Sequence, residues 1–184
     1  MAMYVFQELG PKIFYFTYCL QEIGNYIKFI EETETSEIQD HGLIGPWSKE
    51  EWGYEKRFSS DFSDRPKPIN KRSLFLINNL KSTFHYCFGQ YKIFNNIEED
   101  VNLDTTYWLR KFNEGSTHNN CGSHGKYTAK LYINDSFDGG EVLISGRAPF
   151  KPEAGSIIIA PSLFQIEETP AKNNSRYVAK GHWI

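Results

Sequence analysis

Two stretches of sequence decide the fold of this chain: KYTAKLYINDSFDGGEV, from Lys126 to Val142, and KPEAGSIIIAPSLFQIEETPAKNNSRYVAKGHW, from Lys151 to Trp183. Both are built from short runs of β-branched and aromatic residues, and Gly, Asn, Asp or Pro separates one run from the next. This pattern is typical of short strands that are joined by tight turns. With TYWLRKF at 106–112 before them, these runs predict a carboxy-terminal half made of strands.

Turn residues stand at two places between the predicted strands. Pro152 and Gly155 predict the turn into the strand that follows, along which alternate side chains point into the core. A hairpin is expected earlier, because Gly adopts a positive φ at little cost and Asn or Asp tolerates one. The residues that predict this hairpin are Asn134, Asp135, Gly139 and Gly140.

The amino-terminal half predicts a strand and two helices. KIFYF at 12–16 has strand composition, and residues 32–71 are polar and turn-rich, which predicts a long loop region with room for short strands. Two sets of apolar residues follow helical spacing: Ile23, Tyr26, Ile27 and Ile30, and then Ile77, Leu80, Phe84 and Phe88. Two helices followed by many short strands indicate an α+β fold. A chain of 184 residues fits a single domain, in which residues 1–105 support the strands of residues 106–184.

Composition and charge narrow the classes of function. The formal net charge is −3 and the pI is near 6.0, so we expect no nucleic-acid partner. The three cysteines lack a CxxC spacing and predict neither a disulfide framework nor a zinc site. No apolar run approaches the ~20 residues that cross a bilayer, and the first residues lack the pattern of a signal peptide. We therefore expect a cytoplasmic protein without a membrane partner, in the virion or host cytoplasm if a phage encodes it.

The two stretches resemble the prolyl 4-hydroxylase-like branch of the iron(II) and 2-oxoglutarate oxygenases, of the kind common in bacteria and phages. In that branch a strand ends in a YLND-like motif, a turn reads GGE, and a Pro, Gly, apolar-strand, Pro-Ser run precedes an Arg-Tyr pair. The matching positions are Tyr132–Asp135, Gly139–Glu141, Pro152, Gly155, Ile157–Ile159, Pro161, Ser162, Pro170, Arg176 and Tyr177. The resemblance implies a double-stranded β-helix core, jelly-roll or cupin-like, with the amino-terminal helices packed on its major sheet.

The resemblance also locates one iron ligand that this chain has lost. Enzymes of this kind hold Fe(II) with two His and one carboxylate on one face. The second His lies on the strand after the Pro-Ser pair, and the alignment between Gly155 and Arg176 has no gap. That position is Ile166, whose side chain has no lone pair to donate.

The first His and the carboxylate form an HxD motif in the family, and two registers are possible in this chain. One places them at His118 and Asn120, and the other at Cys121 and Ser123. Neither register contains a carboxylate, so the resemblance implies no metal ligands at these degenerate positions. A compact cluster of His118, Cys121 and His124 is an alternative metal site, although it lacks the ligand from the opposing strand.

The co-substrate positions are retained where the metal ligands are not. In the family, the Arg at the position of Arg176 forms a bidentate pair with the distal carboxylate of 2-oxoglutarate. Tyr132, on the facing strand, could donate a hydrogen bond from its hydroxyl to the same carboxylate. In a regular strand Glu168 points to the same side as Ile166. Our hypothesis is that Glu168 pairs with Arg176 and occupies the place of that carboxylate, because a buried Arg left alone is costly.

These residues lead to three competing hypotheses about function. The first is a protein without catalytic residues, metal or cofactor that serves as a binding, assembly or structural subunit and has a protein partner or larger assembly. Aromatic residues of the central segment could form its partner surface: Trp47, Trp52, Phe58 and Phe62. The second is an active dioxygenase with an altered metal site, which would need iron(II) and 2-oxoglutarate to hydroxylate a peptidyl proline or another side chain. The third, a 2-oxoglutarate sensor, needs Arg176 to be free.

Overall fold

A computed structural model of the chain describes residues 6–34, 44–50, 53–59, 71–102, 106–116, 125–144, 147–164 and 166–184. These described residues fold mostly into sheet, with two helices. The helices are α1 (Ile23–Glu34) and α2 (Lys71–Phe94). Both form where the apolar spacing predicts them, since residues at i, i+3, i+4 and i+7 share one helix face. In the described part of the chain, no helix is both long enough and apolar enough to cross a membrane.

The main sheet has eight antiparallel strands in the order β1-β2-β9-β6-β12-β5-β4-β3. Strands that are far apart in sequence therefore lie side by side at its centre. The bounds of the eight strands in chain order are β1 (Phe6–Gly10), β2 (Ile13–Phe16), β3 (Ile44–Glu50), β4 (Gly53–Ser59), β5 (Thr106–Phe112), β6 (Tyr127–Tyr132), β9 (Ser156–Pro161) and β12 (Arg176–Trp183).

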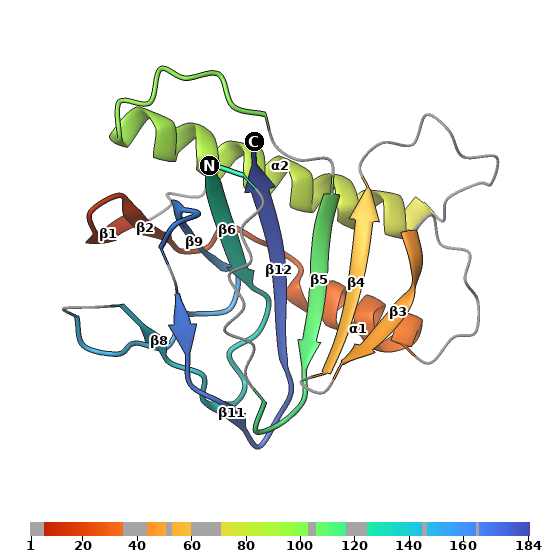
Figure 1. Ribbon diagram of the computed structural model, residues 1–184. Coiled ribbons are helices and arrows are strands. Elements are labelled where there is room, and N and C mark those ends of the chain that lie inside the picture. The colour runs from red at the N-terminus through yellow and green to blue at the C-terminus, as the bar shows by residue number, and fades with distance from the viewer. Residues whose placement is uncertain are drawn as a thin grey trace.

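Two further pairs of short strands lie outside the main sheet. β7 (Asp138–Gly139) pairs with β11 (Ala171–Lys172), and β8 (Val142–Leu143) pairs with β10 (Glu167–Glu168). In Figure 1, α2 passes behind the main sheet, while the parts labelled β8 and β11 lie away from α2. The main sheet therefore has the helices on one side and the short strand pairs near the other.

The helix-covered face of the main sheet carries the larger apolar core. Phe88 of α2 stacks on Trp183 of β12 with 4.1 Å between ring centroids, and Phe84 meets the same indole edge-on at 6.2 Å. Tyr26 of α1 is fully buried in the same cluster. The expectation that the amino-terminal helices pack on the major sheet is therefore confirmed.

The opposite face of the sheet carries a second apolar cluster. Alternation along β9 separates the two clusters, because Ile157 and Ile159 join the helix side while Ile158 and Ala160 point the other way. The second cluster consists of Leu9, Ile13, Tyr15, Phe112, Tyr132, Val142, Ile144, Ile158, Ala160, Ile166 and Val178. This cluster surrounds the charged residues described in the next subsection.

The predicted hairpin after β6 is not present. β6 pairs with β9 and β12, and the chain then leaves the main sheet to form β7. The side chain of Asn134 fastens this crossover, since its Nδ2 donates to Ser175 O at 2.9 Å and its Oδ1 accepts from Tyr177 N at 2.8 Å. The positive φ expected at Gly139 and Gly140 is confirmed, at 68° and 71°.

The segment predicted as a loop region contributes two strands of seven residues each, β3 and β4. They extend the main sheet beside β5, and β3 is its edge strand. Edge strands are commonly polar and tolerate Pro, which explains why IGPWSKE lacks the apolar pattern of an inner strand. Trp47 and Phe58 belong to these strands, whereas Trp52 and Phe62 lie outside the described residues.

Candidate functional site

A buried carboxylate, that of Glu168, stands at the centre of the candidate site. Glu168 is 4% exposed and Ile166 is 3% exposed, whereas Glu167 between them is exposed. The strand alternation predicted from the sequence is therefore present, and both side chains point inward. β8 holds this strand in place through the register of Glu168 with Val142.

Three side chains from the main sheet converge on the Glu168 carboxylate. Lys130 Nζ of β6 donates to Oε1 at 2.7 Å, and the hydroxyl of Tyr132, two residues further along, donates to the same oxygen at 2.6 Å. Arg176 Nη2 of β12 lies 2.8 Å from Oε2. The last contact is not aligned as a hydrogen bond, so electrostatic attraction holds this pair together. The ion pair that we expected between Glu168 and Arg176 is present.

Arg176 is fully buried, and its surroundings explain why it needs a carboxylate. Its Nη1 donates a long hydrogen bond of 3.4 Å to Thr169 O, and its guanidinium lies 4.5 Å from the ring centroid of Phe112. The Nε has no hydrogen-bond partner among the residues that the structure describes. Two weak contacts do not replace water around a guanidinium, and Glu168 supplies the compensating charge.

The ionisation of this group follows from its neighbours. Burial raises the pKa of Glu168, but the charges of Lys130 and Arg176 and the hydrogen bonds from Lys130 and Tyr132 outweigh it, so the pKa is lowered. Burial and the adjacent carboxylate raise the pKa of Tyr132 well above its ordinary value. At neutral pH the site therefore holds an ionised Glu168 and a Tyr132 hydroxyl that donates its proton.

Lys130 is a site residue that our interpretation of the sequence missed. A Lys in a strand usually marks a solvated face, but the alternation of KYTAKLY places Lys130 on the same face as Tyr132. Lys130 is 8% exposed and lies opposite Lys180, which is 5% exposed, on β12. The signal in the sequence was that Lys130 lies two residues before Tyr132, so both side chains point to the same face of the strand.

Ile166 occupies the position that the resemblance assigns to the second iron ligand. Its hydrocarbon side chain lies in the apolar cluster with Val142 and Val178. The positions assigned to the first His and the carboxylate, His118 and Asn120 or Cys121 and Ser123, lie outside the described residues, as does His124. Within the described ranges, which do not include residues 117–124, no three His, Cys, Asp or Glu side chains form a group that could hold a metal ion.

Comparison with known proteins gives matches of structure alone. Neither a protein-family model nor a curated protein matches this chain. An oxidoreductase of the 2OG-Fe(II) oxygenase family from Burkholderia pseudomallei has a TM-score of 0.55 and 18% identity, over 85% of this chain and 76% of its own. The viral collagen prolyl hydroxylase of Paramecium Bursaria Chlorella virus-1, solved as a 2OG complex, has a TM-score of 0.59 and 10% identity, over 95% of this chain and 96% of its own.

A third similar structure is a prolyl-4-hydroxylase from Pseudomonas putida. It has a TM-score of 0.51 and 14% identity, over 98% of this chain and 91% of its own. At such identities the likeness shows the fold alone, since a fold hosts many functions. The fold agrees with the resemblance found in the sequence: this chain has the fold of the 2OG-Fe(II) oxygenases and prolyl 4-hydroxylases.

Proposed function

We propose that this chain is a non-catalytic protein with the oxygenase fold, which has lost iron binding and serves as a binding, assembly or structural subunit. One observation carries the proposal. The residue that the resemblance assigns to the co-substrate carboxylate, Arg176, already holds a carboxylate of the chain itself, Glu168. Lys130 and Tyr132 bind that same group.

The strand arrangement supports this interpretation of the site. We infer that the pairs β7·β11 and β8·β10 are the second, smaller sheet of a double-stranded β-helix whose major sheet is the eight-stranded one. The side chains of Ile166 and Glu168 then point into one interior from the side of the smaller sheet, and the side chain of Arg176 points into it from the major sheet. In such an arrangement Glu168 occupies the space between the sheets that a ligand would need.

A tethered carboxylate is a strong competitor of a free one. Glu168 is held near Arg176 by its own strand, so its effective concentration there is of the order of millimolar or higher. A second carboxylate at Arg176 would meet the charge of Glu168 or would have to displace it. This argues against 2-oxoglutarate binding at Arg176 and Tyr132, and therefore also against a 2-oxoglutarate sensor.

The side chain at Ile166 supports the loss of iron binding. An isoleucine offers no donor atom, and Ile166 lies in the same apolar cluster as Val142 and Val178, which puts hydrocarbon where the family has an imidazole. The residues described at this position therefore do not fit an iron ion. We further propose a protein partner or larger assembly, because a fold that keeps its scaffold without its chemistry can still present a binding surface.

The alternative function is an active dioxygenase that hydroxylates a peptidyl proline or another side chain with an altered metal site. The likeness to prolyl hydroxylases favours it, and so does the potential of His118, Cys121 and His124 to bind a metal. This function requires iron(II) and 2-oxoglutarate. It therefore predicts that the chain binds both, whereas the first proposal predicts that it binds neither.

One assay separates the two functions. The purified chain is incubated with Fe(II), ascorbate, 2-oxoglutarate and a proline-rich peptide under air, and protein-bound iron and released succinate are measured. The viral collagen prolyl hydroxylase serves as the positive control for the assay. We expect neither stoichiometric iron nor succinate above the rate without protein. Bound iron together with turnover would establish the dioxygenase and overturn our proposal.

A further inference from the structure

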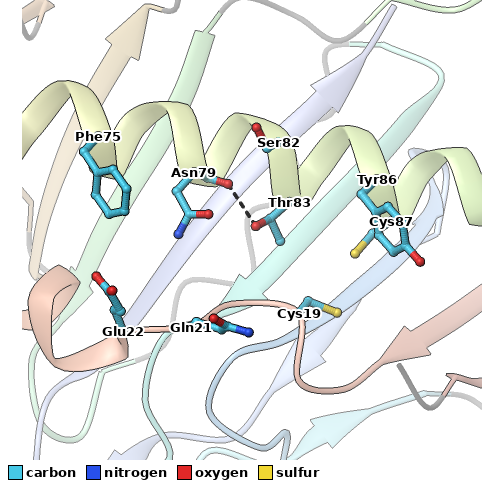
Figure 2. Close-up of a pocket in the computed structure, with 9 residues that line it drawn as sticks. All are labelled: Cys19, Gln21, Glu22, Phe75, Asn79, Ser82, Thr83, Tyr86 and Cys87. Carbon is cyan, nitrogen blue, oxygen red and sulfur yellow. Dashed lines mark hydrogen bonds between the residues drawn. The ribbon is translucent and has the colours of Figure 1, made fainter. Parts of the chain in front are cut away.

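A pocket of about 380 Å³ lies on the helix side of the molecule, across the main sheet from Glu168. Its walls are the segment 19–22, between β2 and α1, and one face of α2, as Figure 2 shows. We call it the α2 pocket. It is lined by Cys19, Gln21, Glu22, Phe75, Asn79, Ser82, Thr83, Tyr86 and Cys87.

Among the described residues that line the pocket, Glu22 is the one of a type that is charged at neutral pH. Its Oε2 accepts a hydrogen bond from Asn25 Nδ2 at 2.9 Å, and no Lys, Arg or His of the described chain pairs with it. The nine lining residues that the structure describes include no Lys, Arg or His. The pocket is therefore an acidic environment with a carboxylate that can accept further hydrogen bonds.

Asn79 adds a second acceptor, whose orientation is fixed by its neighbours. Burial raises the pKa of Tyr26, so its hydroxyl keeps its proton and donates it to Leu76 O at 3.0 Å. The hydroxyl can then only accept from Asn79, at 3.0 Å, which places the amide nitrogen toward Tyr26. The amide oxygen of Asn79, which lines the pocket, is then the side-chain atom that can accept a hydrogen bond.

Two aromatic rings border these acceptors. Phe75 is 54% exposed and Tyr86 is 46% exposed, and their spacing with Asn79 and Ser82 places all four on one face of α2. Figure 2 shows the ring of Phe75 above the carboxylate of Glu22. An aromatic ring and a carboxylate that line the same pocket can both attract an organic cation.

The backbone of the segment 19–22 is held in an unusual conformation beside the pocket. Tyr18 and Glu22 have positive φ values of 57° and 56°, which are uncommon for residues other than Gly. Cys19 N and Leu20 N both donate to Gly155 O, at 2.9 and 3.1 Å, which fixes the segment to the turn before β9. Such conformations occur often at binding sites, where the surrounding structure maintains them.

We infer that the α2 pocket binds an organic cation with several N–H donors, a guanidinium or primary ammonium group on a short aliphatic stem. The cationic group donates to Glu22 and to the amide oxygen of Asn79, and it lies against the ring of Phe75. The stem lies along the segment 19–22, toward Cys19. The cation comes either from a free amine or from the end of a basic side chain of a partner peptide.

This inference does not depend on the proposed function, and a titration tests it directly. ¹H–¹⁵N spectra of the full chain are recorded with increasing agmatine, a free guanidinium, and with N-acetylarginine methylamide, a peptide-like one. N-acetylcitrulline methylamide, which is isosteric with the latter but uncharged, is the ligand control. We expect saturable shifts at Glu22, Phe75 and Asn79 with one or both cations, smaller shifts with citrulline, and weaker binding at high salt.

Two variants and a matched control complete the experiment. Glu22→Gln keeps the acceptor for Asn25 and should weaken binding about fivefold by removing an exposed charge. Phe75→Leu should weaken it about threefold. Glu98→Gln removes an exposed carboxylate outside the pocket and should leave the affinity unchanged. Shifts with agmatine alone indicate a free amine, and shifts with the capped arginine indicate a peptide. Shifts with neither cation, or equal binding by Glu22→Gln, overturn the inference.

Discussion

Glu168 balances the charge of two buried cations, and this makes it the residue whose loss should cost most. Replacing Glu168 by Ala leaves Arg176 and Lys130 buried without their carboxylate. Removing one partner of a buried ion pair costs about 3–5 kcal/mol. We therefore expect Glu168→Ala to lower the free energy of unfolding by about that amount, as measured by urea denaturation.

The neighbouring acid provides the control for this change. Glu167 is exposed on the same two-residue strand, so Glu167→Ala should change the free energy of unfolding by about 0.5 kcal/mol or less. Equal destabilisation by both variants would show that the strand, and not the buried charge, is responsible.

The same carboxylate makes a prediction about pH. The pKa of Glu168 is lowered in the folded chain relative to its ordinary value of 4.5, so the unfolded chain takes up the proton first as the pH falls. The contribution of Glu168 is therefore complete above about pH 4.5 and is lost as the pH falls through the folded pKa. We expect the stability of Glu168→Gln, which does not titrate, to fall less below pH 4.5 than that of the parent chain. Parallel stability curves in urea titrations over this range would contradict the lowered pKa.

An added carboxylate should replace the one that is removed. In Glu168→Ala, the three groups of Arg176, Lys130 and Tyr132 remain without their anion, and succinate or 2-oxoglutarate can approach them. We expect these acids to raise the melting temperature of Glu168→Ala and not that of the parent chain, in a thermal-shift assay. The double variant Glu168→Ala/Arg176→Ala is the control and should not respond. A response of the parent chain equal to that of Glu168→Ala would show that Glu168 does not block the site.

The positions of site residues could be predicted from the sequence where the alternation of side chains along one strand was sufficient. Ile166 and Glu168 could be placed on one face because a strand alternates, and the charge of Arg176 pointed to Glu168 as its partner. Alternation also places Lys130 on the face of Tyr132, but it does not identify the partner of Lys130, because Lys130 and Glu168 lie 38 positions apart in sequence and on different sheets. The pairing of two sheets is a property of the fold, and no local pattern encodes it.

Among the elements, the crossover after β6 depends on the glycine at position 139. A Cβ at Gly139 would lie 2.4 Å from Pro170 O, and its φ is +68°. Gly115 has a similar φ of +76° with nothing within 4 Å of its Cβ position. We expect Gly115→Ala to cost about 1 kcal/mol through its backbone alone, and Gly139→Ala to cost more than about 2 kcal/mol. Chemical denaturation of both variants measures the difference, and equal costs would exclude the clash with Pro170.

Elements with a strong periodicity were predictable, and those at the sheet edge were not. The apolar spacing around Ile23 and Ile77 predicted both helices, and the runs ending at Phe112 and Trp183 predicted β5 and β12. β3 and β4 lack this signal, because the outer strands of a sheet tolerate polar side chains and Pro. The prediction of a hairpin after β6 was wrong for another reason. The side-chain amide of Asn134 forms hydrogen bonds to Ser175 O and Tyr177 N at the start of β12, and it does not stabilise a tight turn.

At the scale of the whole molecule, the main sheet separates two chemically different compartments. The helix side has its apolar core and the acidic α2 pocket, and the other side has a buried cluster of positive charge around Glu168. Residues that face the two compartments alternate along the same strands, such as Tyr132 and Leu131 in β6. A substitution on one face can therefore be made with little change to the other.

The central place of β12 has a consequence for how the chain is made. β12 lies between β5 and β6, yet it is the last of the described strands to leave the ribosome. Until Trp183 has emerged, β5 and β6 each have an inner edge with unpaired backbone groups, and Arg176 is not yet available to Glu168. During synthesis the chain therefore carries open strand edges, which are the backbone groups through which partly made sheets pair with other chains or with chaperones. The eight residues of β12 both close the sheet between β5 and β6 and bring Arg176 to Glu168.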